Sequence, residues 1–359
     1  MKVAIIGLPN SGKTTVFNAL TRGKAATAAY TSGRFEPNLA TAIVPNPCLP
    51  VLACLYHPKK VTPADVQYID ISGLGNGARA SNGLPPALLS YIKGADALLH
   101  VVRAFTDEGV PHPVGAIDLE RDVAALDLEL ICSDLGIIER RIDRLDLEIS
   151  KIAKDRARRL AERDALARLR AALEEGIPVR DVELGDGEER FLRGYQLLTA
   201  KPTLVVLNIG EAQLQCPPSY AYPHRHSEVV ALCGKVEAEL AHMDDGDAQV
   251  FMDDLEISTP ARERVIAASY QLLGLISFLT VGPDEVRAWT IRHGTSALEA
   301  GGAIHSDIQR GFIRAEVVAY EQLIKAGSMS DAKKGGAVRI EGKHYIVQDR
   351  DVCNFLFNV

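Results

Sequence analysis

The chain has 359 residues, of which 47% are hydrophobic and 24% are charged, and this length exceeds what one typical core can bury. The composition excludes a disordered protein, and the formal net charge of −7 excludes a general affinity for polyanions, so any nucleic-acid contact must be local. We therefore expect two or three folded domains.

A P-loop pattern opens the chain. Residues 7–14 read G-L-P-N-S-G-K-T, and they follow a short apolar strand pattern and precede a helical one, which is the context that a P-loop requires. In such a loop the backbone N–H groups surround phosphate oxygens, Lys13 reaches the β- and γ-phosphates, and the Thr14 hydroxyl is a ligand of Mg²⁺. The motif predicts a nucleoside triphosphate site that includes Asn10, Ser11, Gly12, Lys13, Thr14 and Thr15.

A second motif, D-x-x-G, ends the apolar strand predicted at 66–71. Asp70 would hold Mg²⁺ through a water molecule, and the N–H of Gly73 would sense the γ-phosphate. With the P-loop, this motif predicts a GTPase-like switch domain whose loops are ordered by the triphosphate. Ras-type enzymes next carry a glutamine that orients the attacking water, but this chain has Leu74, which forms no hydrogen bond. Hydrolysis must therefore use another group or be very slow.

A long insert of different character precedes the strand predicted at 203–207. Apolar residues recur at spacings of three and four from Leu128 to Ile152, which predicts a coiled-coil seam, and a shorter pattern ending at Leu173 predicts a return helix. We expect an antiparallel helical hairpin over residues 121–199. Its basic tip predicts either a solvated surface with intrahelical ion pairs or a contact with RNA phosphate, for example on the ribosome. The basic residues of this tip are Lys151, Lys154, Arg156, Arg158, Arg159 and Arg163.

The motif for base recognition, N-I-G-E, starts at Asn208. A guanine site normally reads N-K-x-D, so Ile209 replaces the lysine that packs over the base and Glu211 replaces the aspartate. Asn208 can still pair with a purine N7 and a 6-amino group, which is the pattern of adenine. The motif favours ATP over GTP, and a loop without a role in binding is the alternative. The residues assigned to ATP beyond the P-loop are Gly73, Asn208, Ile209, Glu211, Cys233 and Gly234.

Apolar strands alternate with helices through these motifs. Such alternation predicts an α/β fold, with a mostly parallel sheet covered by helices and a phosphate site at the carboxyl ends of its strands. The strands are predicted at 3–8, 66–71, 97–104, 203–207 and 228–233, and the helices at 14–22, 86–93 and 235–242.

The residues from Ser277 onward differ in composition. They are rich in β-branched and aromatic residues and in glycine turns, which is consistent with a compact α+β domain. Basic and acidic residues balance there, so charge does not predict RNA binding. One local basic group, which a solvated loop would equally explain, consists of Lys333, Lys334, Arg339 and Lys343.

The six cysteines are scattered without C-x-x-C spacing, which is typical of reduced thiols rather than of disulfides or a metal site. The apolar run at the N-terminus is too short for a signal peptide, and no stretch approaches the roughly 20 apolar residues of a membrane span. We expect a cytoplasmic, monomeric protein without a membrane partner.

These motifs resemble the Obg-like ATPases, also called the YchF family, nearly from end to end. The resemblance includes the P-loop, the Glu36-Pro-Asn run, and the motifs at Asp70 and Asn208. Its most specific parts are the runs EVRAWTI from Glu285, GFIRA from Gly311 and DRDVCNFLFNV from Asp349. It implies an ATPase in a translation-factor-type GTPase fold, with an inserted helical hairpin and a C-terminal, ubiquitin-like TGS domain at 277–359.

The resemblance also implies a catalytic residue. Family members carry a hydrophobic residue where this chain has Leu74. In these proteins a histidine in a mobile loop after the fourth strand is thought to take the role of the missing glutamine. The matching residue is His112. By itself, a loop histidine between two prolines is typical of a solvated side chain.

The chain departs from the family pattern in both switch segments. Arg34 stands where members carry a threonine that completes the Mg²⁺ shell. Either Thr31 or Ser32 substitutes after a shift of the loop, or Arg34 reaches the γ-phosphate as a positive charge in cis. Two prolines, Pro85 and Pro86, fix backbone angles and remove donors in the second segment. These changes leave nucleotide binding secure but put hydrolysis and switching in doubt.

We expect a slow, regulatory ATPase that couples its nucleotide state to the ribosome or to RNA. Its nucleotide domain would span 1–120 and 200–276, and Mg²⁺ is the expected cofactor, with K⁺ as a further candidate ion. His112, Leu74 and Arg34 are the residues expected to determine catalysis. The alternatives are a nucleotide-dependent binding module with little turnover and a GTP-dependent, nucleic-acid-binding GTPase.

Overall fold

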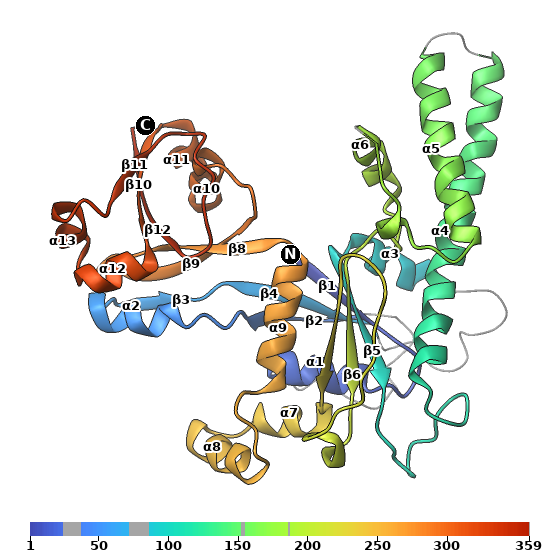
Figure 1. Ribbon diagram of the computed structural model, residues 1–359, viewed down its shortest axis with the longest axis horizontal. Helices are drawn as coiled ribbons and strands as arrows, with labels where there is room; N and C mark the ends of the chain where they lie inside the picture. The colour runs from blue at the N-terminus through green and yellow to red at the C-terminus, as the bar shows by residue number, and fades with distance from the viewer. Residues whose placement is uncertain (24–36, 72–85, 152–154, 186, 359) are drawn as a thin grey trace. The chain divides into compact units, whose positions relative to one another are not determined.

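The computed structural model describes residues 1–23, 37–71, 86–151, 155–185 and 187–358 (Figure 1). Its contacts divide the chain into two compact units, Met1–Ala40 with Gln67–Val265 and Thr41–Val66 with Ile266–Val359. The inserted hairpin is therefore part of the first unit, and the second unit includes an early segment of the chain. The boundaries that we expect at 121–199 and 277–359 stay a prediction.

The first unit is built on a sheet in the order β2-β4-β1-β5-β6-β7, and β4, β1, β5, β6 and β7 pair in parallel. The central strands β5 and β6 are buried along their whole length, as their unbroken apolar sequences predict for a parallel sheet covered by helices. The predicted α/β class is confirmed. The strands are β1 (Lys2–Ile6), β2 (Asn38–Ile43), β4 (Asp65–Asp70), β5 (Ala97–Arg103), β6 (Thr203–Asn208) and β7 (Ser227–Leu232).

The order of these strands determines where a ligand can bind. β1 lies between β4 and β5, so the chain crosses the sheet in both directions from β1, and open α/β sheets bind ligands at such a switch point. The register places Ile5 beside Asp70, and Arg103 beside Asn208, at the carboxyl ends of their strands. The P-loop and both later motifs therefore meet at one edge of the sheet.

Helices complete the first unit. They are α1 (Lys13–Thr21), α3 (Pro86–Gly94), α4 (Leu119–Lys151), α5 (Arg156–Glu174), α6 (Glu188–Leu192), α7 (Gly234–Leu240) and α8 (Asp245–Asp254), with single 3-10 turns at Val179–Asp181, Arg193–Tyr195 and Glu211–Gln213. α9 (Ala261–Leu272) runs from the first unit into the second. Among the described residues, no helix combines the length and apolar character that crossing a bilayer requires.

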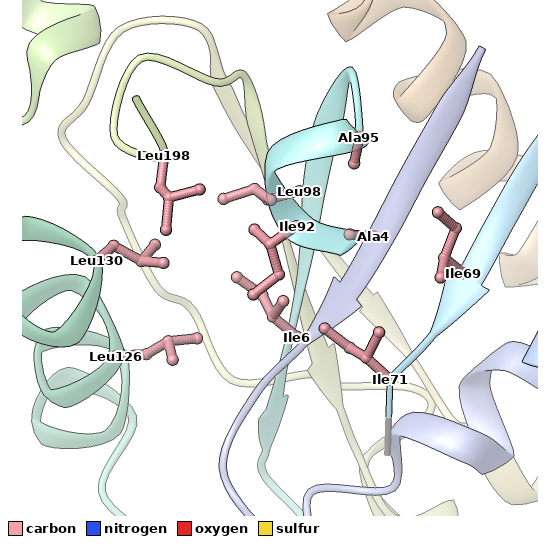
Figure 2. Packing of buried hydrophobic residues seen from close by; sticks show 10 residues of the cluster. All are labelled: Ala4, Ile6, Ile69, Ile71, Ile92, Ala95, Leu98, Leu126, Leu130 and Leu198. Carbon is pink, nitrogen blue, oxygen red and sulfur yellow. The ribbon is translucent and has the colours of Figure 1, made fainter. Parts of the chain in front are cut away.

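The start of α4 packs against the sheet. Leu126 and Leu130 of this helix contact a buried cluster that includes Ile6, Ile92 and Leu98 from β1, α3 and β5 (Figure 2). Truncating such a leucine to alanine typically costs about 2–5 kcal/mol of stability. This packing fixes the first turns of α4 relative to the nucleotide-binding edge.

Beyond the sheet, α4 pairs with α5 as the predicted hairpin (Figure 1). The core between the two helices includes Ile138 and Leu145 facing Leu166 and Leu169, all with less than 2% of their surface exposed. Leu128, which we place in the seam by its spacing, is instead 60% exposed. The reason is that α4 turns Leu126 and Leu130 toward the sheet, so the hairpin seam starts only at the next turn.

The second unit holds a mixed sheet in the order β11-β10-β12-β8-β9-β3. β12 is parallel to β8 and β3 is parallel to β9, whereas the other described pairs are antiparallel. Phe278, Ala300, Val317 and Phe355 form its core with other apolar residues. That a TGS domain spans 277–359 stays a prediction. Its strands are β3 (Lys60–Thr62), β8 (Leu275–Thr280), β9 (Glu285–Arg292), β10 (Phe312–Ala319), β11 (Arg339–Glu341) and β12 (Asp351–Phe357). Its helices are α2 (Cys48–Tyr56), α10 (Ala297–Ile304), α11 (Ser306–Arg310), α12 (Tyr320–Ala326) and α13 (Met329–Lys334).

Candidate nucleotide-binding site

Two glycines shape the P-loop. Gly7 and Gly12 have φ angles of +149° and +87°, a region that other residues rarely adopt. A Cβ atom at Gly7 would lie 2.3 Å from the Val101 carbonyl oxygen, and one at Gly12 would lie 2.3 Å from Nδ2 of Asn208. The loop therefore passes so close to β5 and β6 that only glycine fits at these two positions.

The loop leads directly into the N-terminus of α1. Gly12 is the N-cap and provides no side-chain cap, so the first backbone N–H groups of the helix remain available for an anion. Lys13 donates from Nζ to the Leu8 carbonyl at 2.9 Å, which keeps its ammonium group over the loop. This is the geometry that a P-loop needs to bind phosphate.

A pair of oxygen ligands lies beside the loop. The Thr14 hydroxyl donates to Oδ2 of Asp70 at 2.9 Å, and Asp70 is only 1% exposed. Asn38 donates to the same carboxylate oxygen at 3.3 Å. Sequence reasoning gave Asn38 no role, although it ends the Glu36-Pro-Asn run of the resemblance.

These groups fit Mg²⁺ in the way that phosphate-binding enzymes hold it. The described residues contain no cluster of three or more His, Cys, Asp or Glu side chains that could hold a metal ion by themselves. Mg²⁺ is usually bound through one or two carboxylates together with phosphate oxygens, and Thr14 with Asp70 offers such a partial set of hard oxygen ligands.

Asn208 joins the base loop to the P-loop. Its Nδ2 donates to the Ser11 carbonyl at 2.9 Å, and its Oδ1 accepts from the Gly234 N–H at 3.0 Å. An amide side chain has two N–H donors and two acceptor lone pairs. One donor and one lone pair of Asn208 therefore remain for hydrogen bonds to the edge of a purine base. A Cβ atom at Gly234 would lie 3.0 Å from Asn208 Oδ1 and 3.4 Å from Cγ2 of Thr15, so glycine permits the close approach.

Ile209 and Glu211, the other two residues assigned to the base motif, differ in how far their side chains are exposed. Ile209 is 4% exposed and packs in the core beneath the loop, so its side chain is not offered to a base. Glu211 is half exposed, and its carboxylate lies 2.8 Å from Nζ of Lys235. The hydrogen bond from Lys235 to Glu211 raises the pKa of the ammonium group. Cys233, the N-cap of α7, is 2% exposed, and burial raises the pKa of its thiol.

Sequence reasoning missed two residues at the end of β5, Arg103 in the strand and Phe105 just after it. The Phe105 ring lies 3.9 Å from the position of a Cβ atom on Gly12, and its own Cβ lies 3.6 Å from that position on Gly210, so this ring borders both nucleotide loops. Arg103 is 3% exposed, donates from Nε to the Phe105 carbonyl at 3.1 Å and lies over the Phe105 ring. An aromatic residue directly after a central strand is the signal that could have indicated Phe105.

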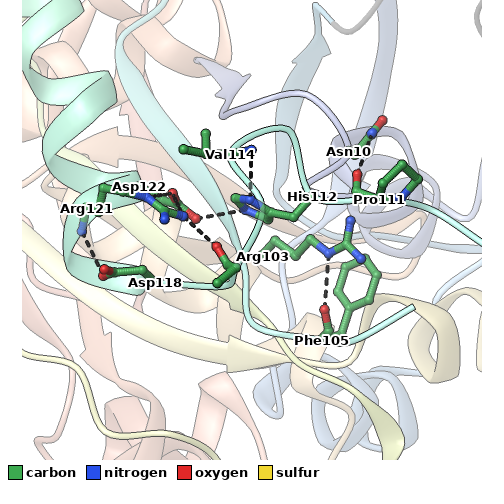
Figure 3. Close-up of polar contacts among 10 residues, drawn as sticks. Asn10, Arg103, Phe105, Pro111, His112, Val114, Asp118, Arg121 and Asp122 are labelled. Carbon is green, nitrogen blue, oxygen red and sulfur yellow. Dashed lines mark hydrogen bonds and ion pairs between the residues drawn. The ribbon is translucent and has the colours of Figure 1, made fainter. Parts of the chain in front are cut away.

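His112 lies in the loop between β5 and α4 (Figure 3). Its main chain is beside the P-loop, since Asn10 donates to the Pro111 carbonyl at 3.1 Å. Its imidazole faces α4 instead, with Nε2 3.0 Å from Oδ2 of Asp122, and its side chain is only 4% exposed. The solvated side chain that the flanking prolines favour is therefore not what the structure shows.

Several predicted site residues lie outside the described residues. Nothing is placed for Gly73, Leu74, Arg34, Lys154 or Pro85, and Lys151 is described only as the end of α4. Their roles stay predictions.

At the hairpin tip, some of the predicted RNA contacts are engaged in ion pairs. These pairs are Arg159 with Glu148 (3.1 Å) and Arg163 with Asp146 (2.9 Å) and Asp164 (3.3 Å). Arg156 and Arg158 are exposed, and within the described chain neither pairs with an acidic side chain. Among the tip side chains that the structure describes, the positive charge available to a partner is therefore concentrated at Arg156 and Arg158.

The basic group of the second unit is also largely compensated. Its ion pairs are Lys333 with Glu316 (2.8 Å), Lys334 with Asp331 (3.2 Å) and Arg339 with Glu341 (3.5 Å). Lys343 is exposed, and in the described part of the chain it has no acidic partner. The structure does not bring these four residues together as an uncompensated basic patch.

Comparison with known proteins identifies relatives over the whole chain. A family model described as a 50S ribosome-binding GTPase matches residues 2–159, and one for the YchF-GTPase C-terminal region, described as a protein of unknown function, matches 275–358. The Ribosome-binding ATPase YchF of Bacillus subtilis is 41% identical over 369 residues and that of Escherichia coli O157:H7 is 38% identical over 364 residues. The alignments cover 100% of this chain in both cases, with 100% of the Bacillus protein and 99% of the Escherichia protein. The solved structure of a YchF GTPase from Schizosaccharomyces pombe matches with a TM-score of 0.87 and 28% identity over 99% of this chain and 97% of that one.

Proposed function

We propose that this chain, which belongs to the YchF family, is a slow ATPase that binds the ribosome and changes that binding with its nucleotide state. The curated relatives are named ribosome-binding ATPases, whereas the Schizosaccharomyces protein is named a GTPase. The choice of base therefore needs an argument from this chain's own residues.

One observation carries the preference for adenine. Glu211, at the position of the aspartate that reads guanine, is held in an ion pair by Lys235 at 2.8 Å, and its side chain is one methylene longer. The longer side chain shifts the carboxylate from the position in which an aspartate accepts from the N1–H and 2-amino groups of guanine, and Lys235 is a competing partner for it. Asn208 keeps one acceptor lone pair for the 6-amino group of adenine and one N–H donor for its N7.

The phosphate-binding groups suit a triphosphate with Mg²⁺. Thr14 and Asp70 would hold Mg²⁺ here, and the ion would neutralise charge on the β- and γ-phosphates. Lys13 adds a positive charge at the same phosphates, and the amides of Gly12 and Lys13 at the start of α1 surround their oxygens. A K⁺ ion stays a prediction.

For hydrolysis we propose that His112 positions the attacking water, with Leu74 and Arg34 as further determinants. The placement of the Pro111–His112 main chain beside Asn10 supports this role, because it brings the histidine to the edge of the P-loop. The observed imidazole points away from that edge toward α4, which supports slow basal turnover. It equally supports a second candidate function, a nucleotide-dependent binding module with little turnover.

We propose that the hairpin tip contacts ribosomal RNA through Arg156 and Arg158, with Lys343 in the second unit as a further contact. The exposure of the two arginines and the rigid core behind them support this assignment. We also propose that the protein acts as a monomer in the cytoplasm, where its proposed partner is found.

A phosphate-release assay with ATP, with and without ribosomes, tests the proposed function. We expect slow release from the parent protein and none from Lys13→Ala, because that change removes the charge at the β- and γ-phosphates. Lys59→Ala is the matched control, since Lys59 is an exposed lysine of the second unit. Release by Lys13→Ala at the parental rate would contradict the proposal, and binding without any release would favour the binding module.

A further inference from the structure

Hydrogen bonds hold the loop that carries His112 at its start and again just before the histidine. At its start, Arg103 donates from Nε to the Phe105 carbonyl at 3.1 Å and from Nη2 to the Asp107 carbonyl at 3.4 Å. Just before the histidine, the Pro111 carbonyl accepts from Asn10 of the P-loop. The main chain at His112 is therefore fixed beside the P-loop, and its side chain is the part that can move.

Both nitrogen atoms of the imidazole face neighbouring groups in the observed position. Nδ1 accepts from the Val114 N–H at 3.3 Å, which assigns the proton of the neutral ring to Nε2, and Nε2 faces Asp122 at 3.0 Å (Figure 3). The side chain is 4% exposed. In this position neither nitrogen can orient a water molecule at the nucleotide.

Asp122 is itself held in place from the other side. Its Oδ1 accepts from Nε and Nη2 of Arg121 at 3.0 and 2.8 Å, and Arg121 also donates to the Ala116 carbonyl at 2.7 Å. These bonds leave Oδ2 directed at His112, and Asp122 as a whole is only 2% exposed.

The contact between the two side chains is close but not well aligned. Oδ2 of Asp122 has no hydrogen bond of normal geometry, although Nε2 of His112 lies within ion-pair distance of it. Charge and burial therefore hold the imidazole, and a contact of this kind is easier to open than an aligned hydrogen bond.

We infer that Asp122 is a positioning residue that holds His112 in an inactive orientation, turned away from the bound nucleotide. Opening the contact lets the imidazole turn about its side-chain bonds toward the P-loop while the Pro111 carbonyl stays on Asn10. The inference rests on the proposed function, in which His112 positions the attacking water. It adds that the slow turnover is set by a contact within the chain itself.

The direct test is the substitution Asp122→Asn, assayed for phosphate release at a series of ATP concentrations. The amide keeps the size of the side chain and an acceptor for Arg121 but removes the negative charge that faces Nε2. We expect kcat to rise severalfold with KM for ATP unchanged. Glu120→Gln is the matched control, because it removes an exposed acid from the same helical turn, and its kcat should equal that of the parent.

A double variant shows whether the effect passes through His112. In a His112→Ala background, Asp122→Asn should give no gain in kcat, whereas a merely structural role of Asp122 would lower stability without this dependence. A kcat for Asp122→Asn that is unchanged or lower, or a gain that persists without His112, overturns the inference. If ATP fails to bind the parent in calorimetry, the proposed function fails instead, so the two failures are distinguishable.

A readout that does not depend on turnover keeps the inference testable. In protein with ¹⁵N-labelled histidines, the His112 signals are those absent from His112→Ala, and their shifts report which nitrogen carries the proton. The parent should show the Nε2–H form alone, and Asp122→Asn should show a mixture of both forms. A mixture already present in the parent would overturn the inference.

Discussion

Replacing Asn208 by alanine should weaken both the fold and the binding of ATP, because this amide joins the P-loop to the start of α7. The change removes two hydrogen bonds, one to the Ser11 carbonyl and one from the Gly234 N–H. Both partners are buried, so each is left without a partner at a cost of about 1–3 kcal/mol. The vacated space is lined by polar groups and can admit a water molecule, which favours the lower half of that range.

We therefore expect Asn208→Ala to lower the free energy of unfolding by about 2–4 kcal/mol. Urea denaturation measures this loss, and calorimetry on the folded variant measures the weaker binding of ATP. Asn354→Ala is the control, because Asn354 is exposed and bonds only to Glu316 within the described chain. A variant as stable as the parent, with unchanged affinity for ATP, would refute the idea that Asn208 holds the two loops together.

Three further changes test other parts of the account. Lys235→Ala releases the Glu211 carboxylate, so the ratio of ATP to GTP affinity should fall in paired titrations. Changing Arg156 and Arg158 together to glutamate should weaken cosedimentation with ribosomes and flatten its dependence on salt, while affinity for ATP is kept. Burial, together with the charge of Lys13, lowers the pKa of His100 from 6.5 to about 3. The neutral His100 side chain therefore makes its full contribution to the free energy of unfolding above pH 6.5, and this contribution is lost as the pH falls toward 3. From pH 6.5 to pH 5 this loss should be about 2 kcal/mol in urea denaturation, and His100→Leu should abolish it.

Each of these predictions has a control or a result that counts against it. A Lys235→Ala variant with the parental nucleotide ratio would remove the ion pair from base selection. For the hairpin, Arg140→Glu with Arg144→Glu makes the same charge change on the exposed shaft of α4, and equal weakening by both pairs would point to general charge repulsion. An unaltered pH slope in His100→Leu would assign the acid sensitivity to other groups.

The strands of the first sheet could be predicted from the sequence because each is a run of apolar residues followed by a motif with a known geometry. The strand predicted at 203–207, for example, is β6 at Thr203–Asn208, and its end carries the base loop as expected. The pairing of β3 with β9 could not be predicted from the sequence. β3 has only three residues and no apolar run, so its place in the second sheet depends on a partner far along the chain.

Within the site, the sequence could indicate which residues meet phosphate but not how the remaining side chains are turned. Thr14 and Asp70 meet because the P-loop leads from the carboxyl end of β1 into α1, and Asp70 ends β4 beside Ile5 of β1. The burial of Ile209 and the contact of His112 with Asp122 depend on packing between separate elements, which no local pattern reports. The sequence around a loop histidine between two prolines does not indicate that Asp122, ten positions later on α4, contacts its side chain.

The most direct test of the central claim is a calorimetric titration of the parent protein with ATP and with GTP in the presence of Mg²⁺. The ion pair between Glu211 and Lys235 and the remaining hydrogen-bonding capacity of Asn208 predict that ATP binds at least severalfold more tightly. GTP binding that is equal to or tighter than ATP binding would contradict the assignment of this chain as an ATPase.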